Sequence, residues 1–314
     1  MNRDFGVFIN PERPRYSLIR DEVLTTERLG FDSVWLSDHV FGLVGSPANP
    51  FYECWTTTSA LAAETKRVRL GQLVMCNPFR HPPIVAKMGA TLDSISDGRV
   101  ILGLGTGWAE DEFKAYGYPF EKPSTRVRRV SEAAQIIRKM WTEEEASFKG
   151  HHYEIGGAYC SPKPVQKPHP PIMIAGSGEQ LTLKAVARYA DWSNFVAWFG
   201  SPEAFSDKVD VLNKHGDAVG RDTGEITKSF AVYVLIGEDR AEAEAKEAYF
   251  NETMEKRWGP GFDRKAPLRG TPEEIINQIG EYRDTGVDYF IVRFMGGDFQ
   301  READVFSALV LPEV

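Results

Sequence analysis

The sequence has few cysteines, and no two of them are spaced as a pair. Its only thiols are Cys54, Cys76 and Cys160, and no Cys-x-x-Cys occurs. An odd and sparse set of thiols does not build the disulfide framework of a secreted domain, and it lacks the ligand spacing of a zinc site. The pattern indicates a reducing compartment, so we expect a cytoplasmic protein.

Long apolar runs and basic runs are also missing. No stretch of about 18 or more apolar residues is present, and the first ten residues lack a signal-peptide pattern, so we expect no membrane association. A formal net charge of −8 without a long basic run argues against binding to nucleic-acid phosphates. The adjacent His151 and His152 would face opposite ways in a strand, and no carboxylate cluster accompanies them. We therefore expect no metal site.

What the sequence does have is a regular alternation of short β-branched runs and helical patterns. Eight segments are candidate strands: Phe5–Ile9, Ser33–Ser37, Arg69–Met75, Val100–Leu104, Pro171–Ala175, Trp192–Val196, Ser229–Leu235 and Asp288–Arg293. Strict alternation of strand and helix implies a parallel sheet covered by helices. Eight such units favour a closed (β/α)₈ TIM barrel over an open doubly wound sheet, in one domain spanning residues 1–314.

Apolar residues at helical spacing predict the helices between these strands. The clearest are Arg126–Trp141 and Pro83–Ile95, and the second should turn a row of four apolar side chains inward: Ile84, Met88, Leu92 and Ile95. Another helix should begin after Thr271, an N-cap followed by proline and two glutamates. The segment Glu238–Glu255, rich in alanine and glutamate, is interpreted as a solvated helix.

Two gaps between the predicted strands are longer than one helix requires. They cover Gly105–Pro170 and Ile236–Val287, and we interpret both as insertions. Insertions in barrels gather around the active-site mouth, so we expect these two to shape it. Within the first, Phe148–Pro171 is rich in glycine and proline and should be extended rather than helical.

Chemistry in this fold lies at the carboxyl ends of the strands. The second predicted strand ends in Ser37-Asp38-His39, which would place two titratable groups at the mouth of the barrel. The ordinary pKa of histidine lies near neutrality, so His39 could donate a proton to a reacting carbonyl or orient it. The alternative is structural, with Asp38 capping a loop and His39 filling space.

Glycines follow two other strands. Gly103, Gly105 and Gly107 alternate at the end of the fourth, where the missing side chains would leave backbone N–H groups open to a close ligand; the spacing is not that of a dinucleotide fingerprint. The fifth strand runs into Gly176-Ser177-Gly178 and then a helix expected from about Gln180. A helix N-terminus with free N–H groups suits a phosphate, although a tight turn without a ligand would look the same.

At these residues the sequence resembles the bacterial luciferase-like superfamily, and within it the branch that uses the deazaflavin coenzyme F-420. The similar segments span roughly residues 6–194, with a looser match at 269–274. They are Gly30–His39, Val68–Gly71, Asp97–Gly105, Gly107–Trp108, Glu112–Phe113, Phe148–Tyr153, Pro162–Pro168, Pro170–Ile172 and Ala175–Gly178. So many motifs in the same order make a chance match a poor explanation.

The resemblance implies where the redox ring of the cofactor would lie. Asp38 and His39 would flank the ring, with His39 as its acid or orienting group. The bond between Leu73 and Val74 matches the position of a cis non-prolyl peptide in these proteins, which forms a bulge against the back of the ring. The resemblance also implies a homodimer and a small-molecule substrate.

The resemblance further implies contacts to the cofactor tail and to the substrate. The tail phosphate would rest on Gly176-Ser177-Gly178, just after Ala175. Thr106 stands where light-emitting luciferases carry a basic phosphate contact, and its uncharged side chain favours the deazaflavin over flavin mononucleotide (FMN). Trp108 occupies a substrate-side position that is acidic in the sugar-phosphate dehydrogenases of the superfamily, so their substrate does not carry over.

Three functions remain open. The first is hydride transfer between coenzyme F-420 and a small organic substrate. The second is an FMN-dependent monooxygenase that uses reduced flavin and oxygen, since the motifs overlap and the same loop could hold either phosphate. The third is a cofactor-binding or structural relative that has lost activity, which the intact Ser37-Asp38-His39 disfavours.

Overall fold

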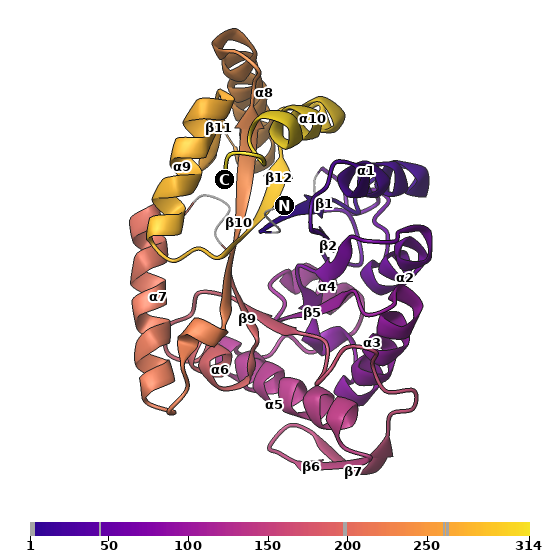
Figure 1. Ribbon diagram of the computed structural model, residues 1–314. Helices are drawn as coiled ribbons and strands as arrows, with labels where there is room; N and C mark the ends of the chain where they lie inside the picture. Colours follow the sequence, from indigo (N-terminus) through magenta and orange to yellow (C-terminus); the bar gives the residue numbers. More distant parts are fainter. Residues whose placement is uncertain (1–3, 44, 197–199, 260, 262–263) are drawn as a thin grey trace.

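The computed structural model describes residues 4–43, 45–196, 200–259, 261 and 264–314, and its strands form a closed barrel with the helices outside (Figure 1). Eight parallel strands make the ring: β1 (Phe5–Ile9), β2 (Ser33–Leu36), β3 (Arg69–Gln72), β5 (Val100–Gly105), β8 (Ile172–Ala175), β9 (Trp192–Val196), β10 (Thr227–Ile236) and β12 (Tyr289–Phe294). Each pairs with the next, β12 pairs with β1, and β9 pairs with β10. The predicted (β/α)₈ barrel is confirmed.

The third predicted strand is interrupted. Strand β3 ends at Gln72, and a separate short strand, β4 (Met75–Cys76), pairs with β5. Between them the peptide bond from Leu73 to Val74 is cis. The prediction of one continuous strand was therefore wrong, because the chain leaves the sheet at the position where the family resemblance implies a bulge.

Ten α-helices occur in the described part of the chain. They are α1 (Tyr16–Arg28), α2 (Cys54–Glu64), α3 (Pro82–Ser96), α4 (Glu110–Ala115), α5 (Pro123–Thr142), α6 (Thr182–Tyr189), α7 (Pro202–Asp217), α8 (Arg240–Trp258), α9 (Pro272–Asp284) and α10 (Phe299–Leu309). Helix α5 contains the predicted Arg126–Trp141. Helix α9 follows Thr271, whose backbone N–H donates to the side chain of Glu274 at 2.9 Å, so the predicted N-terminus is confirmed.

The predicted inner face of α3 was wrong in part. Ile84 and Ile95 are 57% and 50% exposed, whereas the face that packs inward is made of small residues around Gly89. A Cβ atom on Gly89 would come within 2.6 Å of the Trp141 ring of α5. The small side chains let α3 approach α5 closely, and a pattern read from large apolar residues alone does not reveal that face.

The two long insertions occupy different places. The first supplies α4 at the barrel mouth, α5, and a hairpin of β6 (Glu145–Lys149) and β7 (Glu154–Tyr159), which lies beside α5 (Figure 1). The Glu132 carboxylate of α5 accepts the N–H groups of the hairpin turn, including those of His151 and His152, each at 2.9 Å. The hairpin thus packs outside the barrel, so only part of this insertion shapes the mouth. The extended character of Phe148–Pro171 is confirmed.

The second insertion contains α8, the short strand β11 (Leu268–Gly270) beside β10, and α9. Helix α8 is not solvated all round, because Phe250 and Met254 are buried against Tyr233 and Leu235. The predicted solvated face is present, since residues such as Glu244 and Glu252 are exposed, and the buried face is what the composition did not reveal. None of the described helices has the length and apolar character that crossing a membrane requires.

Side chains close the amino-terminal end of the barrel. At that end the Arg69 guanidinium donates to Asp32, and the Tyr289 hydroxyl donates to the same carboxylate at 2.7 Å. The guanidinium also lies 5.1 Å from the centre of the Trp192 ring, and Trp35 fills the layer above. Because this end is packed, a ligand can enter only from the carboxyl ends of the strands.

Candidate active site

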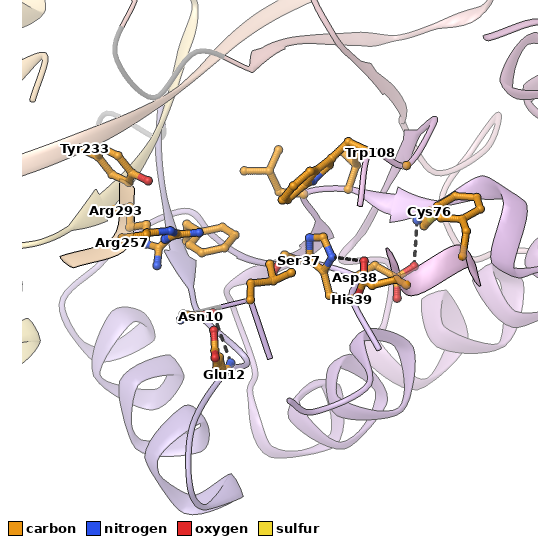
Figure 2. Close-up of a pocket in the computed structure, with 17 residues that line it drawn as sticks. Asn10, Glu12, Ser37, Asp38, His39, Cys76, Trp108, Tyr233, Arg257 and Arg293 are labelled. Carbon is orange, nitrogen blue, oxygen red and sulfur yellow. Dashed lines mark hydrogen bonds and ion pairs between the residues drawn. The ribbon is translucent and has the colours of Figure 1, made fainter. Parts of the chain in front are cut away.

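A cavity of about 420 Å³ opens at the carboxyl ends of β1, β2, β5, β10 and β12 (Figure 2). Five of the residues singled out in the sequence line it: Asp38, His39, Leu73, Val74 and Trp108. Its volume lies in the range of ordinary ligand pockets. The structure therefore brings together, at one opening, residues that the sequence separates by up to 70 positions.

His39 is held by a buried carboxylate. Its Nδ1 lies 2.6 Å from Oε2 of Glu112, and the other oxygen of Glu112 accepts the backbone N–H of Val40 at 2.7 Å. Glu112 is only 1% exposed, so its two carboxylate oxygens are shielded from water and bond to His39 and Val40. The Nε2 atom of His39 has no hydrogen-bond partner in the described part of the chain. The imidazole is thus fixed through one nitrogen and presents the other to the cavity.

Aromatic rings fix the same imidazole from its sides. The ring centres of Trp108 and Phe51 lie 5.5 and 5.7 Å from that of His39, both edge to face. Trp108 is 64% exposed, so it stands on the rim of the cavity rather than in the core. The substrate-side role that the resemblance implies for Trp108 stays a prediction.

Asp38 forms a buried ion pair with Arg80. Its carboxylate accepts two N–H groups of Arg80, at 2.6 and 3.0 Å, and the backbone N–H of Cys76 at 2.8 Å. Arg80 also pairs with Glu53, the residue that caps α2. Burial alone would lower the pKa of Arg80, but the two carboxylates outweigh it and raise that pKa. Asp38 thus ties the end of β2 to β4.

The alternating glycines of β5 accommodate the bulge. A Cβ atom on Gly105 would collide with the side chain of Val74, and one on Gly103 would collide with the carbonyl oxygen of Gln72. The sequence suggested that these glycines leave the backbone open to a ligand, whereas the structure fills the space with the neighbouring bulge. The missing side chains let Leu73 and Val74 reach the cavity.

The loop Gly176-Ser177-Gly178 lies outside this cavity, at the end of β8. The Gly176 N–H donates to the carbonyl of Asn194 at 2.9 Å, so it is not available to a ligand. Within the described residues, the N–H groups of Ser177 and Gly178 meet no protein acceptor. Helix α6 begins at Thr182, two residues later than expected, so the turn and the helix terminus are further apart than the sequence suggested.

Thr106 lies on the same rim as that loop. Leu104 of β5 pairs with Ile174 of β8, and Thr106 directly follows β5 just as Gly176 directly follows β8. A basic group that the sequence did not single out is also close, because the Arg126 guanidinium donates to the backbone carbonyls of Thr106 and Gly107. The rim between β5 and β8 therefore combines free N–H groups with a nearby positive charge.

Residues 3–289 match the family model described as "Luciferase-like monooxygenase". The chain belongs to this family. The luciferase-like assignment that the motifs suggested is therefore confirmed.

Luciferase-like relatives differ in the cofactor that their names state. The F-420-dependent glucose-6-phosphate dehydrogenase of Intrasporangium calvum is 31% identical, covering 93% of this chain and 93% of the relative. The FMNH(2)-dependent dimethylsulfone monooxygenase of Pseudomonas putida is 28% identical, covering 92% and 85%. An F-420-dependent secondary alcohol dehydrogenase has the same fold, with a TM-score of 0.83 at 21% identity over 99% of this chain and 98% of that one. The chain is therefore a luciferase-like oxidoreductase, from a family whose members' names state either F-420 or reduced FMN.

The sequence did not identify three residues of this luciferase-like site as functional groups. Glu112 appeared only within a motif, and nothing in the sequence marks it as buried. Arg257 and Arg293 line the cavity from the end of α8 and the end of β12. Only Arg293 could have been found from the sequence, because it is the last residue of the final predicted strand and should therefore lie at the mouth of the barrel.

Proposed function

We propose that this luciferase-like oxidoreductase transfers a hydride between coenzyme F-420 and a small organic substrate. The observation that carries the proposal is the pairing of His39 with Glu112 at a cavity that the Leu73–Val74 bulge also lines. An oriented imidazole with one exposed nitrogen is what proton transfer to a substrate oxygen requires. The bulge supplies an apolar surface against which a flat ring can lie.

The residues present fit such a cofactor. Leu73 and Val74 line the cavity because glycines lie behind them. Outside the cavity, after β8, the N–H groups of Ser177 and Gly178 have no protein acceptor within the described residues and could bind a phosphate. The positive charge of Arg126 lies nearby, although it donates to backbone carbonyls. When bound, the deazaflavin would supply the carbon that gives or takes the hydride.

The protein groups would then manage the proton. With Glu112 accepting from Nδ1, the Nε2 atom of His39 can give a proton to a substrate carbonyl oxygen during reduction, or take one from an alcohol during oxidation. Trp108 and Phe113, which line the cavity next to His39, would keep water from the reacting atoms. Asp38 would hold β2 and β4 in position through Arg80.

Two observations favour the deazaflavin over FMN. By the family resemblance, Thr106 stands where the light-emitting luciferases carry a basic residue that contacts the phosphate, and its own side chain is uncharged. The relative of higher identity among the two described is named for F-420. The FMN-dependent monooxygenase remains the second candidate because its relative covers almost as much of the chain. The homodimer implied by the resemblance stays a prediction.

We expect F-420 to raise the melting temperature of the apo protein more than FMN does, because a ligand that binds only the native state stabilises it. At a concentration of about 100 times Kd the gain is about 2.7 kcal/mol. Ser177→Asp should abolish this gain by placing a carboxylate where the phosphate would bind, whereas Ser94→Asp, on the exposed surface of α3, should not. Stabilisation by FMN alone would overturn the choice of cofactor, and stabilisation by neither would favour the non-catalytic reading.

A further inference from the structure

We infer that Trp108 limits the length of the substrate, because it separates the active-site cavity from a second cavity. The second cavity has a volume of about 480 Å³ and lies between the loop after β2 and the start of α4. Trp108 and Leu43 line both cavities, so they form the boundary between them. The inference rests on the proposed function, which places the reacting carbon of the substrate beside His39, and it goes further by naming what limits the substrate at that end.

The indole of Trp108 is held by packing on one side only. Its ring contacts the ring of His39 edge to face, with 5.5 Å between the ring centres (Figure 2). In the described part of the chain no other aromatic ring lies against it, and 64% of the residue is exposed. Removing the indole should therefore open the boundary between the two cavities without leaving a void in the core.

The backbone before Trp108 is fixed, which keeps the indole in place. Gly107 has a φ of +73°, and a Cβ atom there would come within 2.6 Å of the Phe113 ring and 2.7 Å of the Cys76 sulfur. Its carbonyl oxygen accepts from the Arg126 guanidinium. Only glycine fits this conformation in so little space, so the chain leaves β5 along one path and holds Trp108 at the boundary.

Hydrogen bonds join the two walls of the second cavity. The Tyr116 hydroxyl, just after α4, donates to the backbone carbonyl of Val40 at 3.0 Å, and the N–H of Val40 donates to Glu112 at 2.7 Å. Within the loop after β2, the Gly42 N–H donates to the carbonyl of Pro47 at 3.3 Å. The loop is thus tied to the helix whose Glu112 holds His39, so the second cavity is built from the same segments as the candidate active site.

The lining of the second cavity suits an uncharged chain. Its apolar side chains include Phe41, Leu43 and Pro47. Its charged lining residues in the described part of the chain, Glu110 and Asp111, are both acidic and would repel an anion. Because Trp108 stands directly beside His39, a chain that extends from the reacting carbon toward the second cavity meets the indole. The wild-type protein should therefore accept short uncharged ketones or secondary alcohols and exclude longer ones.

The test measures the binding of straight-chain methyl ketones, from 2-butanone to 2-decanone, by calorimetry. The protein is loaded with oxidised F-420, which has no hydride to give, so the ketones bind without reacting. A buried methylene contributes about fourfold in affinity, and wild-type affinity should rise by this factor over the shortest ketones and then stop rising. In Trp108→Ala the rise should continue, so that 2-decanone binds at least about tenfold more tightly than to the wild type while 2-butanone binds within about threefold.

Three further variants control for other effects of the substitution. Trp108→Phe keeps an aromatic ring at the boundary and should retain the wild-type limit. Tyr159→Ala removes a ring of similar exposure, 65%, from β7, where it lines neither cavity, and should change no affinity. Trp108→Leu leaves a smaller apolar side chain and takes the place of Trp108→Ala if that variant unfolds. It should show a smaller rise for 2-decanone in the same direction.

Wild-type affinity that keeps rising by the same factor up to 2-decanone would overturn the inference, since no boundary would then limit the chain. So would an equal gain of Trp108→Ala for 2-butanone and 2-decanone, no gain for either, or no binding of 2-butanone to any variant. Failure of the proposed function is a separate result. Wild-type protein would then not load F-420, and the same series with unloaded protein would still show whether Trp108 sets the limit.

Discussion

Replacing His39 by alanine should slow turnover by about 10²-fold or more, the usual contribution of a general acid or base, while the cofactor still binds with nearly wild-type affinity. The reason is geometric. The ring is held by Glu112 through Nδ1 and by aromatic contacts with Trp108 and Phe51, so only its Nε2 atom is directed to the cavity. The measurement is the single-turnover rate of cofactor oxidation or reduction, followed by the cofactor's absorbance with a substrate that the wild-type protein accepts.

The matched control is His152→Ala, which removes an imidazole from the hairpin turn beside α5. It should leave the rate unchanged. If His39→Ala also turned over at the wild-type rate, His39 would have no part in proton transfer, and the cavity would need another donor. If instead the cofactor no longer bound, His39 would act in binding rather than in the chemical step.

Glu112→Gln tests the positioning of His39 and should slow turnover by about tenfold, because losing the charge from this hydrogen bond costs about 1.5 kcal/mol and each 1.4 kcal/mol is about tenfold in rate. Glutamine can still accept from Nδ1, but it carries no charge to stabilise the protonated ring, so the pH dependence of turnover should change together with its rate. Glu110→Gln, an exposed neighbour on α4 that pairs with Lys114 at 2.9 Å, is the control and should alter neither. A lower rate with an unchanged pH profile would mean that Glu112 serves the fold alone.

Local pattern was enough to predict the barrel, because each strand is a short apolar run next to a helical pattern. Strands β1 and β9 begin and end at the predicted residues. The pattern failed where a distant contact decides the structure. Helix α3 turns Gly89 rather than Ile84 inward because Trp141 packs there, and β3 stops at Gln72 because the following bulge fits over the glycines of β5.

In the candidate site, too, local pattern predicted some residues and missed those that depend on distant contacts. His39 could be found because it follows a predicted strand, and strand ends meet at the mouth of a barrel. Its partner Glu112 lies 73 positions away, on a short helix within an insertion, and no local signal marks a glutamate as buried. Arg257 likewise lies at the end of a helix that composition describes as solvated. Residues that act through side-chain contacts between insertions become visible only once the barrel has brought those insertions together.

Asp38→Asn should destabilise the native state by about 3 kcal/mol, which is the lower end of the cost of breaking a buried ion pair. The carboxylate side chain is fully buried and receives two N–H groups of Arg80, whose own side chain is only 15% exposed. Glu53 still pairs with Arg80 in the variant, so the loss should not reach the upper end. For a chain of this size, 3 kcal/mol corresponds to a fall of about 4–5 °C in melting temperature, measurable by calorimetry.

The matched control is Glu53→Gln, which removes the other carboxylate that pairs with Arg80. Glu53 binds the same arginine, but its side chain is 41% exposed, so water can replace it and the loss should stay near 1 kcal/mol or below. Adding Arg80→Met to Asp38→Asn should recover part of the stability, because the cation left without its buried partner is then removed. A change within about 0.5 kcal/mol for Asp38→Asn would contradict the structural role.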